Sequence, residues 1–450
     1  MESVTTRTFN RRRLLAGTAG LAGLAATNRA LAAPTGRWAP YHVSAQATGE
    51  IEFAYYNWGP ESIQYFKDMA AAFEASHPGA KIKLTLPPFD QYDQKIQVLL
   101  ATGNGPDIIT TNNATLALVQ EGRVLDLTDR IAEDPALKDP NIFVQSGWDL
   151  FKFGTDRTYG IYSGADTLLL YYNKSLFDAA GIAYPTEEWT LDNFTEAAKA
   201  LTKRDGDRVT QWGSVLGSFD ADWGWANLVW MEGGDIVDSR PFFNKITLNN
   251  EPVLKILHFL NDLVYTHRAA PTPSQSQSVA DQGGFESGTV ALMVDGGWGI
   301  QPRKAITNFE WDVQMLPKGS QGFVGEFWPG TPFLLSANSK NADLAWEYAK
   351  WFASDPEAQT LIAKQAIQVP ALLSVANSPD FLGQAGLPGN AQAWVKSLQT
   401  ARPGDLFHAK KSELFDKLWT PEWEKFQNNS ITAEEFAQKV EEEGNKLLAG

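Results

Sequence analysis

The sequence contains no cysteine among its 450 residues. This absence excludes disulfide bonds, thiolate metal sites, a cysteine nucleophile and the lipid-bearing cysteine of a bacterial lipoprotein. Only five histidines occur, and they are scattered without the spacing of metal ligands. Asp220 and Asp222 resemble the start of a calcium loop, but the remaining ligand positions do not follow. We therefore expect no metal site and no cofactor.

Familiar catalytic motifs are missing as well. The chain has no Gly-x-Ser-x-Gly elbow, no phosphate-binding P-loop and no His-Glu-x-x-His pair. Acidic residues outnumber basic residues, so the formal net charge is −15 and the pI is about 4.9. An acidic surface repels nucleic acid and anionic lipid, and we expect neither as a partner. A chain of 450 residues is too long for one ordinary core and predicts two domains.

The N-terminus resembles a targeting signal. Arg11, Arg12 and Arg13 precede a short run rich in glycine, alanine and leucine, and Ala30-Leu31-Ala32 supplies small residues for cleavage. The run is too short and too rich in small residues to span a membrane. Residues 1–32 are therefore predicted to be a twin-arginine signal peptide, cleaved near Ala32. The mature chain is expected in the periplasm without a membrane anchor.

Strand and helix patterns alternate along the mature chain. Apolar runs and period-two alternation predict strands at 51–57, 81–86, 106–110 and 168–173. Apolar residues at helical spacing predict helices at 60–77, 90–102, 191–201, 252–266 and 341–354. Residues 203–207 are expected to form a turn and residues 271–278 a loop. The repeated strand–helix rhythm predicts two α/β units with a cleft between them, where ligand sites often form.

Several separated motifs carry a family resemblance, and they keep one order from about Ile51 to beyond Ser378. They are Gly103-Asn104-Gly105-Pro106-Asp107-Ile108-Ile109, Leu170-Tyr171-Tyr172-Asn173-Lys174, Trp189-Thr190-Leu191-Asp192-Asn193-Phe194, Asp295-Gly296-Gly297-Trp298 after Phe285-Glu286-Ser287-Gly288, and Ala345-Trp346-Glu347-Tyr348. With these motifs the chain resembles the family 1 extracellular solute-binding proteins of bacterial ABC importers, which include maltose-binding protein. The match thins after about Ser378.

The resemblance implies an α/β, two-lobed periplasmic-binding-protein fold of the type II-like class, with two mainly parallel or mixed sheets flanked by helices. Its three-segment hinge would cross near 163–166, 313–316 and 366–369. Lobe 1 would comprise 48–164 and 317–366, and lobe 2 would comprise 165–316 and 367–450. Ligand contacts to both lobes would favour the closed state over the open one.

Candidate ligand contacts follow from sugar chemistry, because a sugar presents apolar ring faces and hydroxyl edges. Aromatic rings suit the faces, and carboxylates or amides suit the hydroxyls. Trp58 and Glu61 follow the first strand, and Asn112 and Asn113 follow the strand at 106–110. Strand ends of this kind meet at the ligand edge of a parallel sheet. Glu61 and Asp295 would also be the carboxylate pair of a secreted glycoside hydrolase, the enzymatic alternative.

The family resemblance adds further candidates in lobe 2 and at the crossings. These are Asp166 at the first crossing, Asp222, Trp223 and Trp225 in one loop, and Asp295 and Trp298 in the glycine-rich motif. Trp328 is a further candidate in a later aromatic loop, which departs from the pattern of maltose-binding protein. Each tryptophan has a competing interpretation as a core residue. Trp346, Trp351 and Trp394 lie on helical patterns and are expected in the core.

The resulting expectation is a carbohydrate-binding protein that is not an enzyme. It would capture a mono- or oligosaccharide by tryptophan stacking and by hydrogen bonds from carboxylates and amides, and would close on it. A membrane-embedded ABC permease would be its partner, and the chain itself would be a monomer. A second alternative is a cationic solute such as a polyamine or betaine, because Glu61, Asp166 and Asp222 accompany the tryptophans.

Overall fold

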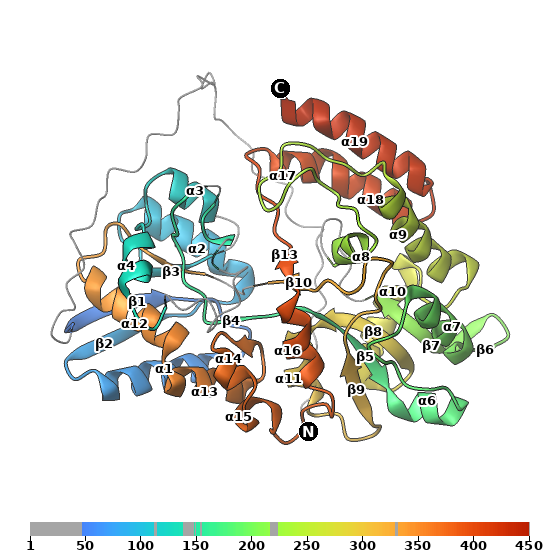
Figure 1. Cartoon of the computed structure of the whole chain (residues 1–450), viewed down its shortest axis with the longest axis horizontal. Helices are drawn as coiled ribbons and strands as arrows, with labels where there is room; N and C mark the ends of the chain where they lie inside the picture. The colour runs from blue at the N-terminus through green and yellow to red at the C-terminus, as the bar shows by residue number, and fades with distance from the viewer. Residues whose placement is uncertain are drawn as a thin grey trace.

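The computed structural model describes residues 47–111, 115–137, 148, 150–153, 155–216, 224–328 and 332–449. Two α/β lobes lie side by side, each with its own sheet (Figure 1). The sheet of lobe 1 has the order β11-β3-β1-β2, with β1, β2 and β3 parallel and β11 antiparallel to β3. Its strands are β1 (Gly49–Ala54), β2 (Ala80–Thr85), β3 (Ile108–Thr110) and β11 (Phe333–Leu335).

Helices pack around the sheet of lobe 1. They are α1 (Pro60–Ser76), α2 (Phe89–Ala101), α3 (Thr115–Gln120), α4 (Thr128–Glu133), α12 (Ala342–Ser354) and α13 (Pro356–Gln365). Helix α1 shows why these segments fold as they do. Pro60 occupies its first turn, where no backbone donor is needed, and Phe66, Met69 and Phe73 bury one face at helical spacing.

Lobe 2 contains a mixed five-stranded sheet of order β6-β7-β8-β5-β9. Only β7 and β8 pair in parallel, and the other neighbours are antiparallel. The strands are β5 (Leu168–Asn173), β6 (Lys203–Asp205), β7 (Arg208–Leu216), β8 (Val290–Gly296) and β9 (Trp311–Gln314). Its helices are α6 (Lys174–Ala180), α7 (Leu191–Leu201), α8 (Ala226–Met231), α9 (Glu251–Asn261), α10 (Pro273–Asp281), α11 (Ile300–Arg303), α17 (Lys411–Leu414), α18 (Thr420–Gln427) and α19 (Ala433–Ala449).

Strand β5 is buried along its whole length and contributes to both hydrophobic cores. Leu169 and Tyr171 join the larger core, which also contains the interior of lobe 1. Leu168, Leu170 and Tyr172 join a second core inside lobe 2. Successive side chains of a strand point to opposite faces, so one short segment takes part in both cores.

The lobes are joined by short paired strands. β4 (Gly164–Ala165) pairs with β12 (Val369–Pro370), and β10 (Glu326–Phe327) pairs with β13 (Arg402–Pro403). Asp166 and Trp328 extend this region by an antiparallel bridge, in which each backbone N–H donates to the other residue's carbonyl at 2.7 and 3.0 Å. The expected first and third crossings therefore lie against each other.

The second crossing lies further along the chain than expected. Residues 311–314 form β9 inside lobe 2, and the backbone of Lys318 and Gln321 still donates to carbonyls of Trp189 and Met231. The chain reaches the interlobe region only at Glu326–Phe327, about a dozen residues after the expected 313–316. The boundary transferred from the resemblance missed an edge strand of this lobe.

The segment after 366 also differs from the expected division. α14 (Leu373–Ala376) and α15 (Pro379–Leu382) pack on α13 of lobe 1, whereas α16 (Gln392–Gln399) packs on β5, β9 and β10. Only after β13 does the chain stay with lobe 2, where α17 to α19 complete its core (Figure 1). The stretch 371–399 thus packs across both lobes.

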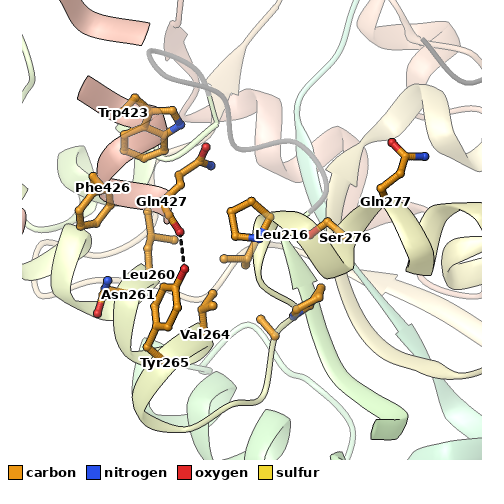
Figure 2. A pocket seen from close by; sticks show the side chains of 13 residues that line it. Leu216, Leu260, Asn261, Val264, Tyr265, Ser276, Gln277, Trp423, Phe426 and Gln427 are labelled. Atoms are coloured by element: carbon orange, nitrogen blue, oxygen red, sulfur yellow. Dashed lines mark hydrogen bonds between the residues drawn. The ribbon is translucent and has the colours of Figure 1, made fainter. Parts of the chain in front are cut away.

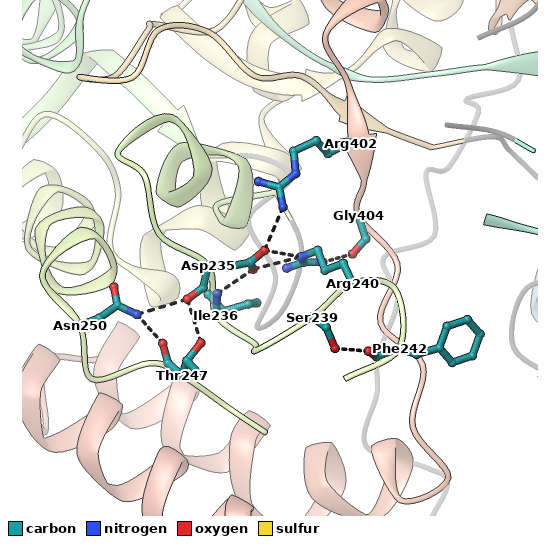
Figure 3. A network of polar contacts seen from close by, with 9 residues as sticks. All are labelled: Asp235, Ile236, Ser239, Arg240, Phe242, Thr247, Asn250, Arg402 and Gly404. Carbon is teal, nitrogen blue, oxygen red and sulfur yellow. Dashed lines mark hydrogen bonds and ion pairs between the residues drawn. The ribbon is translucent and has the colours of Figure 1, made fainter. Parts of the chain in front are cut away.

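An ion-pair network fixes β13 to lobe 2 (Figure 3). Asp235 accepts from Arg240 Nε at 3.0 Å, and Arg402 Nη2 lies 3.6 Å from the same carboxylate. Both guanidinium groups lie over the Trp230 ring, at 4.7 and 5.1 Å, and Arg240 also donates to the carbonyl of Gly404. These contacts hold the returning chain beside the second crossing.

Two local predictions were wrong. The polar stretch at 271–278 was expected as a loop, yet α10 begins at Pro273, because Thr272 and Gln275 form a capping box. Residues 203–207 contain a strand, β6, in addition to the turn at Gly206. Within the described ranges, no helix is long and apolar enough to cross a membrane.

Candidate ligand-binding site

The turn after β8 positions Trp298. The turn is a single 3-10 element, Gly297–Gly299, and the indole at its centre is half-buried. A Cβ on Gly297 would lie 2.1 Å from Nε1 of Trp394, and one on Gly299 would lie 1.8 Å from Nη1 of Arg303. Both distances are far inside van der Waals contact, so glycine is required on either side of Trp298.

Arg303 supports this turn from behind. Its guanidinium is buried, with Nη1 2.8 Å from Oδ2 of Asp295 and Nε 2.9 Å from Oε1 of Glu286. Both contacts are ion pairs between the buried guanidinium and a carboxylate. The guanidinium also lies 4.6 Å above the Tyr171 ring, and the Tyr171 hydroxyl donates to the carbonyl of Gly296 at 2.7 Å. Asp295 therefore has a cationic partner within the protein.

Asp166 lies beneath the same turn. It is 2% exposed, and its Oδ1 accepts from the Thr167 amide and from Nε1 of Trp394, both at 2.8 Å. Burial raises the pKa of this carboxyl well above its ordinary value, and the hydrogen bonds from Thr167 and Trp394 only partly oppose the rise. Burial thus favours the neutral, protonated form of Asp166.

Two indoles meet above this carboxyl. The rings of Trp298 and Trp328 lie 5.0 Å apart at 75°, an edge-to-face arrangement, and both remain partly exposed. Trp328 is held there by its backbone bridge to Asp166. The predicted residues Asp166, Asp295, Trp298 and Trp328 are therefore brought together at the junction of the lobes.

Trp58 and Glu61 lie at the corresponding end of lobe 1. Trp58 follows β1 and is 46% exposed, and Glu61 is exposed on the first turn of α1. The Ser62 hydroxyl fixes this turn, since its Oγ accepts from the Trp58 amide at 3.0 Å and donates to the Gly59 carbonyl at 2.7 Å. The carboxyl ends of parallel strands are where such sheets bind ligands.

Trp225 was expected in the site, but the structure places it in the core of lobe 2. It is 0% exposed and stacks on Trp423 at 5.4 Å and 6°. An indole without an exposed face cannot receive a sugar ring, so we leave Trp225 out of the site. Trp346, Trp351 and Trp394 are buried, which confirms the expectation for them. Asn112, Asn113, Asp220, Asp222 and Trp223, like residues 1–32, lie outside the described residues.

A separate cavity of about 550 Å³ lies in lobe 2 between α9, α10 and α18 (Figure 2). Trp423 and Phe426 face it from α18, and the Tyr265 hydroxyl donates to the Gln427 carbonyl at 2.7 Å. Of the predicted site residues that the structure describes, none lines this cavity. Trp225 lies behind Trp423, on the core side.

Three residues that matter for the site were not predicted. Arg303 is five positions beyond Trp298, and nothing in its local pattern indicates that it supports the turn. Trp394 was expected only as a core residue. Phe89 is 64% exposed at the start of α2, and the short Leu86-Pro87-Pro88 link from β2 could have suggested its place at the edge of the sheet.

Two lobes, a multi-segment hinge and aromatic side chains at the ends of both sheets define a two-domain binding protein. Residues 59–359 match the family model of bacterial extracellular solute-binding proteins. Because the match covers most of the chain, this protein belongs to that family, whose members in ABC importers bind solutes outside the membrane.

Curated relatives and solved structures agree with this assignment. The chain is 26% identical over 334 residues to a galactooligosaccharide-binding protein of Bacillus subtilis, covering 72% of this chain and 73% of the relative. It is 25% identical over 241 residues to an arabinooligosaccharide-binding protein of Halalkalibacterium halodurans, and there the match spans only half of either chain. An ABC substrate-binding protein from Listeria monocytogenes in complex with cycloalternan shares the fold, with a TM-score of 0.74, 24% identity and coverage of 89% and 99%.

Proposed function

We propose that this protein is the substrate-binding component of an ABC importer and that it holds a carbohydrate between its lobes. The observation that carries the proposal is the pair of partly exposed indoles, Trp298 and Trp328, at the lobe junction. Their faces suit the apolar faces of sugar rings. Trp58 offers a third exposed indole from lobe 1. Relatives that bind oligosaccharides support the same ligand class.

Two carboxyl groups at the lobe junction favour a neutral ligand over a cationic one. Asp295 is already paired with Arg303, and burial favours the protonated form of Asp166. These two groups therefore attract a polyamine or betaine less strongly than free carboxylates would, whereas Glu61 on α1 is exposed. Hydroxyl groups of a sugar need hydrogen-bond partners rather than a counter-charge, and amide and carboxyl oxygens supply these.

The same pairing argues against the hydrolase alternative. A glycoside hydrolase needs two carboxyls with separate acid and nucleophile or base roles. One oxygen of Asp295 lies 2.8 Å from the buried guanidinium of Arg303 and is occupied by this ion pair. The family and its structural relatives are binding proteins. We propose that the chain binds its carbohydrate without cleaving it.

Thermal denaturation tests the proposed function. We expect a matching sugar to raise the melting temperature, because a ligand that binds only the folded state stabilises it by about 2.7 kcal/mol at a hundredfold excess over Kd. Arabinose, galactose, glucose and their short oligosaccharides form the first panel, with spermidine and betaine beside them. A response to spermidine or betaine alone would contradict the carbohydrate proposal.

We further propose export to the periplasm, removal of residues 1–32, and delivery of the ligand by a monomer without an anchor to a membrane-embedded permease. The consecutive arginines before the apolar run support this route. In a bacterium with a twin-arginine pathway, mass spectrometry of the exported protein is expected to find Ala33 at its N-terminus. Export after replacement of Arg11, Arg12 and Arg13 by lysine would contradict the twin-arginine route.

A further inference from the structure

A smaller cavity of lobe 2 gathers positive charge on this acidic protein. It has a volume of about 300 Å³ and lies between β6, the first half of β7 and the segment that leads into α10. Arg204 and Arg268 both line it, and we refer to it as the arginine cavity. β6 is an edge strand on the side of lobe 2 that faces away from lobe 1 (Figure 1). Cavities of this size are within the range of small-molecule sites.

The two arginines of this cavity have no carboxylate partner. Among the residues that the structure describes, neither guanidinium forms an ion pair, and Arg204 Nη2 donates to the backbone carbonyl of Arg268 at 2.5 Å. Asp207 is the one carboxylate among the described residues that line the cavity, so two positive charges face one negative charge. The net charge of +1 stands out on a chain of net charge −15 and attracts a singly charged anion.

The backbone that carries Arg268 is irregular. Directly after α9 the chain forms a π-helical turn, Asp262–Thr266, a rare form that is frequent at functional sites. Arg268 then has a φ of 53°, in the left-handed region that residues with a Cβ seldom adopt. Its carbonyl receives the hydrogen bond from Arg204, so the irregular turn brings the two arginines together at one cavity. Local backbone strain of this kind tends to occur where a binding geometry is fixed.

A third donor lies at the start of α10. Oε1 of Gln275 accepts from the amide and the hydroxyl of Thr272, at 3.0 and 3.1 Å. These two bonds fix the orientation of the carboxamide and leave its Nε2 group to donate into the arginine cavity, which Gln275 lines. Guanidinium and amide donors that converge on one place suit a carboxylate, whose two oxygens accept several hydrogen bonds.

The remaining walls of the cavity are apolar. Trp212 is half-buried on β7, and Val209 lies on the same strand. Val264 and Tyr265 come from the π-helical turn and also line the larger cavity in Figure 2. An indole beside cationic donors provides a face for a flat ring that carries an anionic group.

We propose that the arginine cavity binds a small organic acid that has one carboxylate and a flat apolar ring. Arg204, Arg268 and Gln275 hold the carboxylate, and the ring lies against Trp212. Of the described residues that line this cavity, none is a predicted contact of the interlobe ligand. The inference therefore goes beyond carbohydrate binding and does not depend on it.

Titration calorimetry with naphthalene-2-carboxylate as the probe tests the inference. The wild-type protein is expected to bind this probe at least tenfold more tightly than naphthalene-2-carboxamide, which has the same shape without the charge. Acetate has the charge without the ring and should also bind more weakly. Arg204→Gln and Arg268→Gln are each expected to weaken binding of naphthalene-2-carboxylate about tenfold, and Trp212→Leu should weaken it about threefold.

Arg208→Gln is the matched control, because Arg208 is an exposed arginine of β7 that does not line the cavity. It removes the same charge nearby and should leave the affinity unchanged. Circular dichroism checks that each variant is folded. No binding by the wild type, equal binding of the carboxamide, or an equal loss in Arg208→Gln would overturn the inference. Loss of binding in Trp298→Ala with full binding in Arg268→Gln would place the probe between the lobes and would overturn it too.

Discussion

Trp298→Ala is expected to weaken carbohydrate binding by about 2 kcal/mol, roughly thirtyfold in Kd, and to leave the folded state nearly as stable as before. The indole is half-buried on a three-residue turn and shares its contacts with Trp328. Removing it takes away a stacking face, while the turn keeps the support of Arg303 and Tyr171 from behind. Trp298→Phe, which keeps a smaller ring, should lose less affinity.

Calorimetry and urea denaturation of the same variants separate binding from folding. Trp351→Phe serves as the control, since Trp351 is 5% exposed on α12 and packs in the core of lobe 1. It should lower the free energy of unfolding and leave Kd unchanged. If Trp298→Ala instead lost several kcal/mol of stability at an unchanged Kd, Trp298 would be a core residue.

Arg303→Met should lower the free energy of unfolding by about 2–3 kcal/mol. The substitution keeps an apolar stem but leaves Asp295 and Glu286 without their cationic partner and removes the cation above Tyr171. We do not expect a loss of stability as large as that caused by breaking a fully buried ion pair. The Glu286 side chain is 42% exposed, and water screens its charge. Urea denaturation followed by tryptophan fluorescence measures the loss.

Two further variants test whether charge pairing is the cause. Arg157→Met breaks an ion pair with Asp126 at the surface and should lower the free energy of unfolding much less than Arg303→Met does. Adding Asp295→Asn to Arg303→Met removes the carboxylate that lost its partner in the single variant. The double variant should therefore regain part of the lost free energy of unfolding. A single Arg303→Met variant as stable as the wild type would show that the guanidinium does not hold the turn.

The secondary structure was most predictable where the local signals were strong. The apolar run at 168–173 became β5 with the expected bounds, and Thr190 caps α7 as its spacing indicated. Both segments have a signal that needs no distant partner: burial on two faces in one case, a capping residue in the other. The two-lobed architecture followed from the repeat of such segments and from the family resemblance.

The site was only partly predictable, because its contacts are long-range. Nothing local distinguishes Trp225, which stacks on Trp423 in the core, from Trp298, which stays partly exposed. The partner that makes Trp225 a core residue lies nearly two hundred positions away in the sequence. Phe89 was overlooked because it begins a helix, and its exposure depends on the pairing of β1 with β2.

The burial of β5 between two cores affects how the chain unfolds. Leu169 and Tyr171 cannot leave their core without Leu168 and Leu170 leaving theirs, because all four belong to one strand. The two faces of the lobe 2 sheet are therefore expected to lose their packing together, because β5 supplies side chains to both. Hydrogen exchange should then show the amides of β5 opening in one step with those of its neighbours β8 and β9.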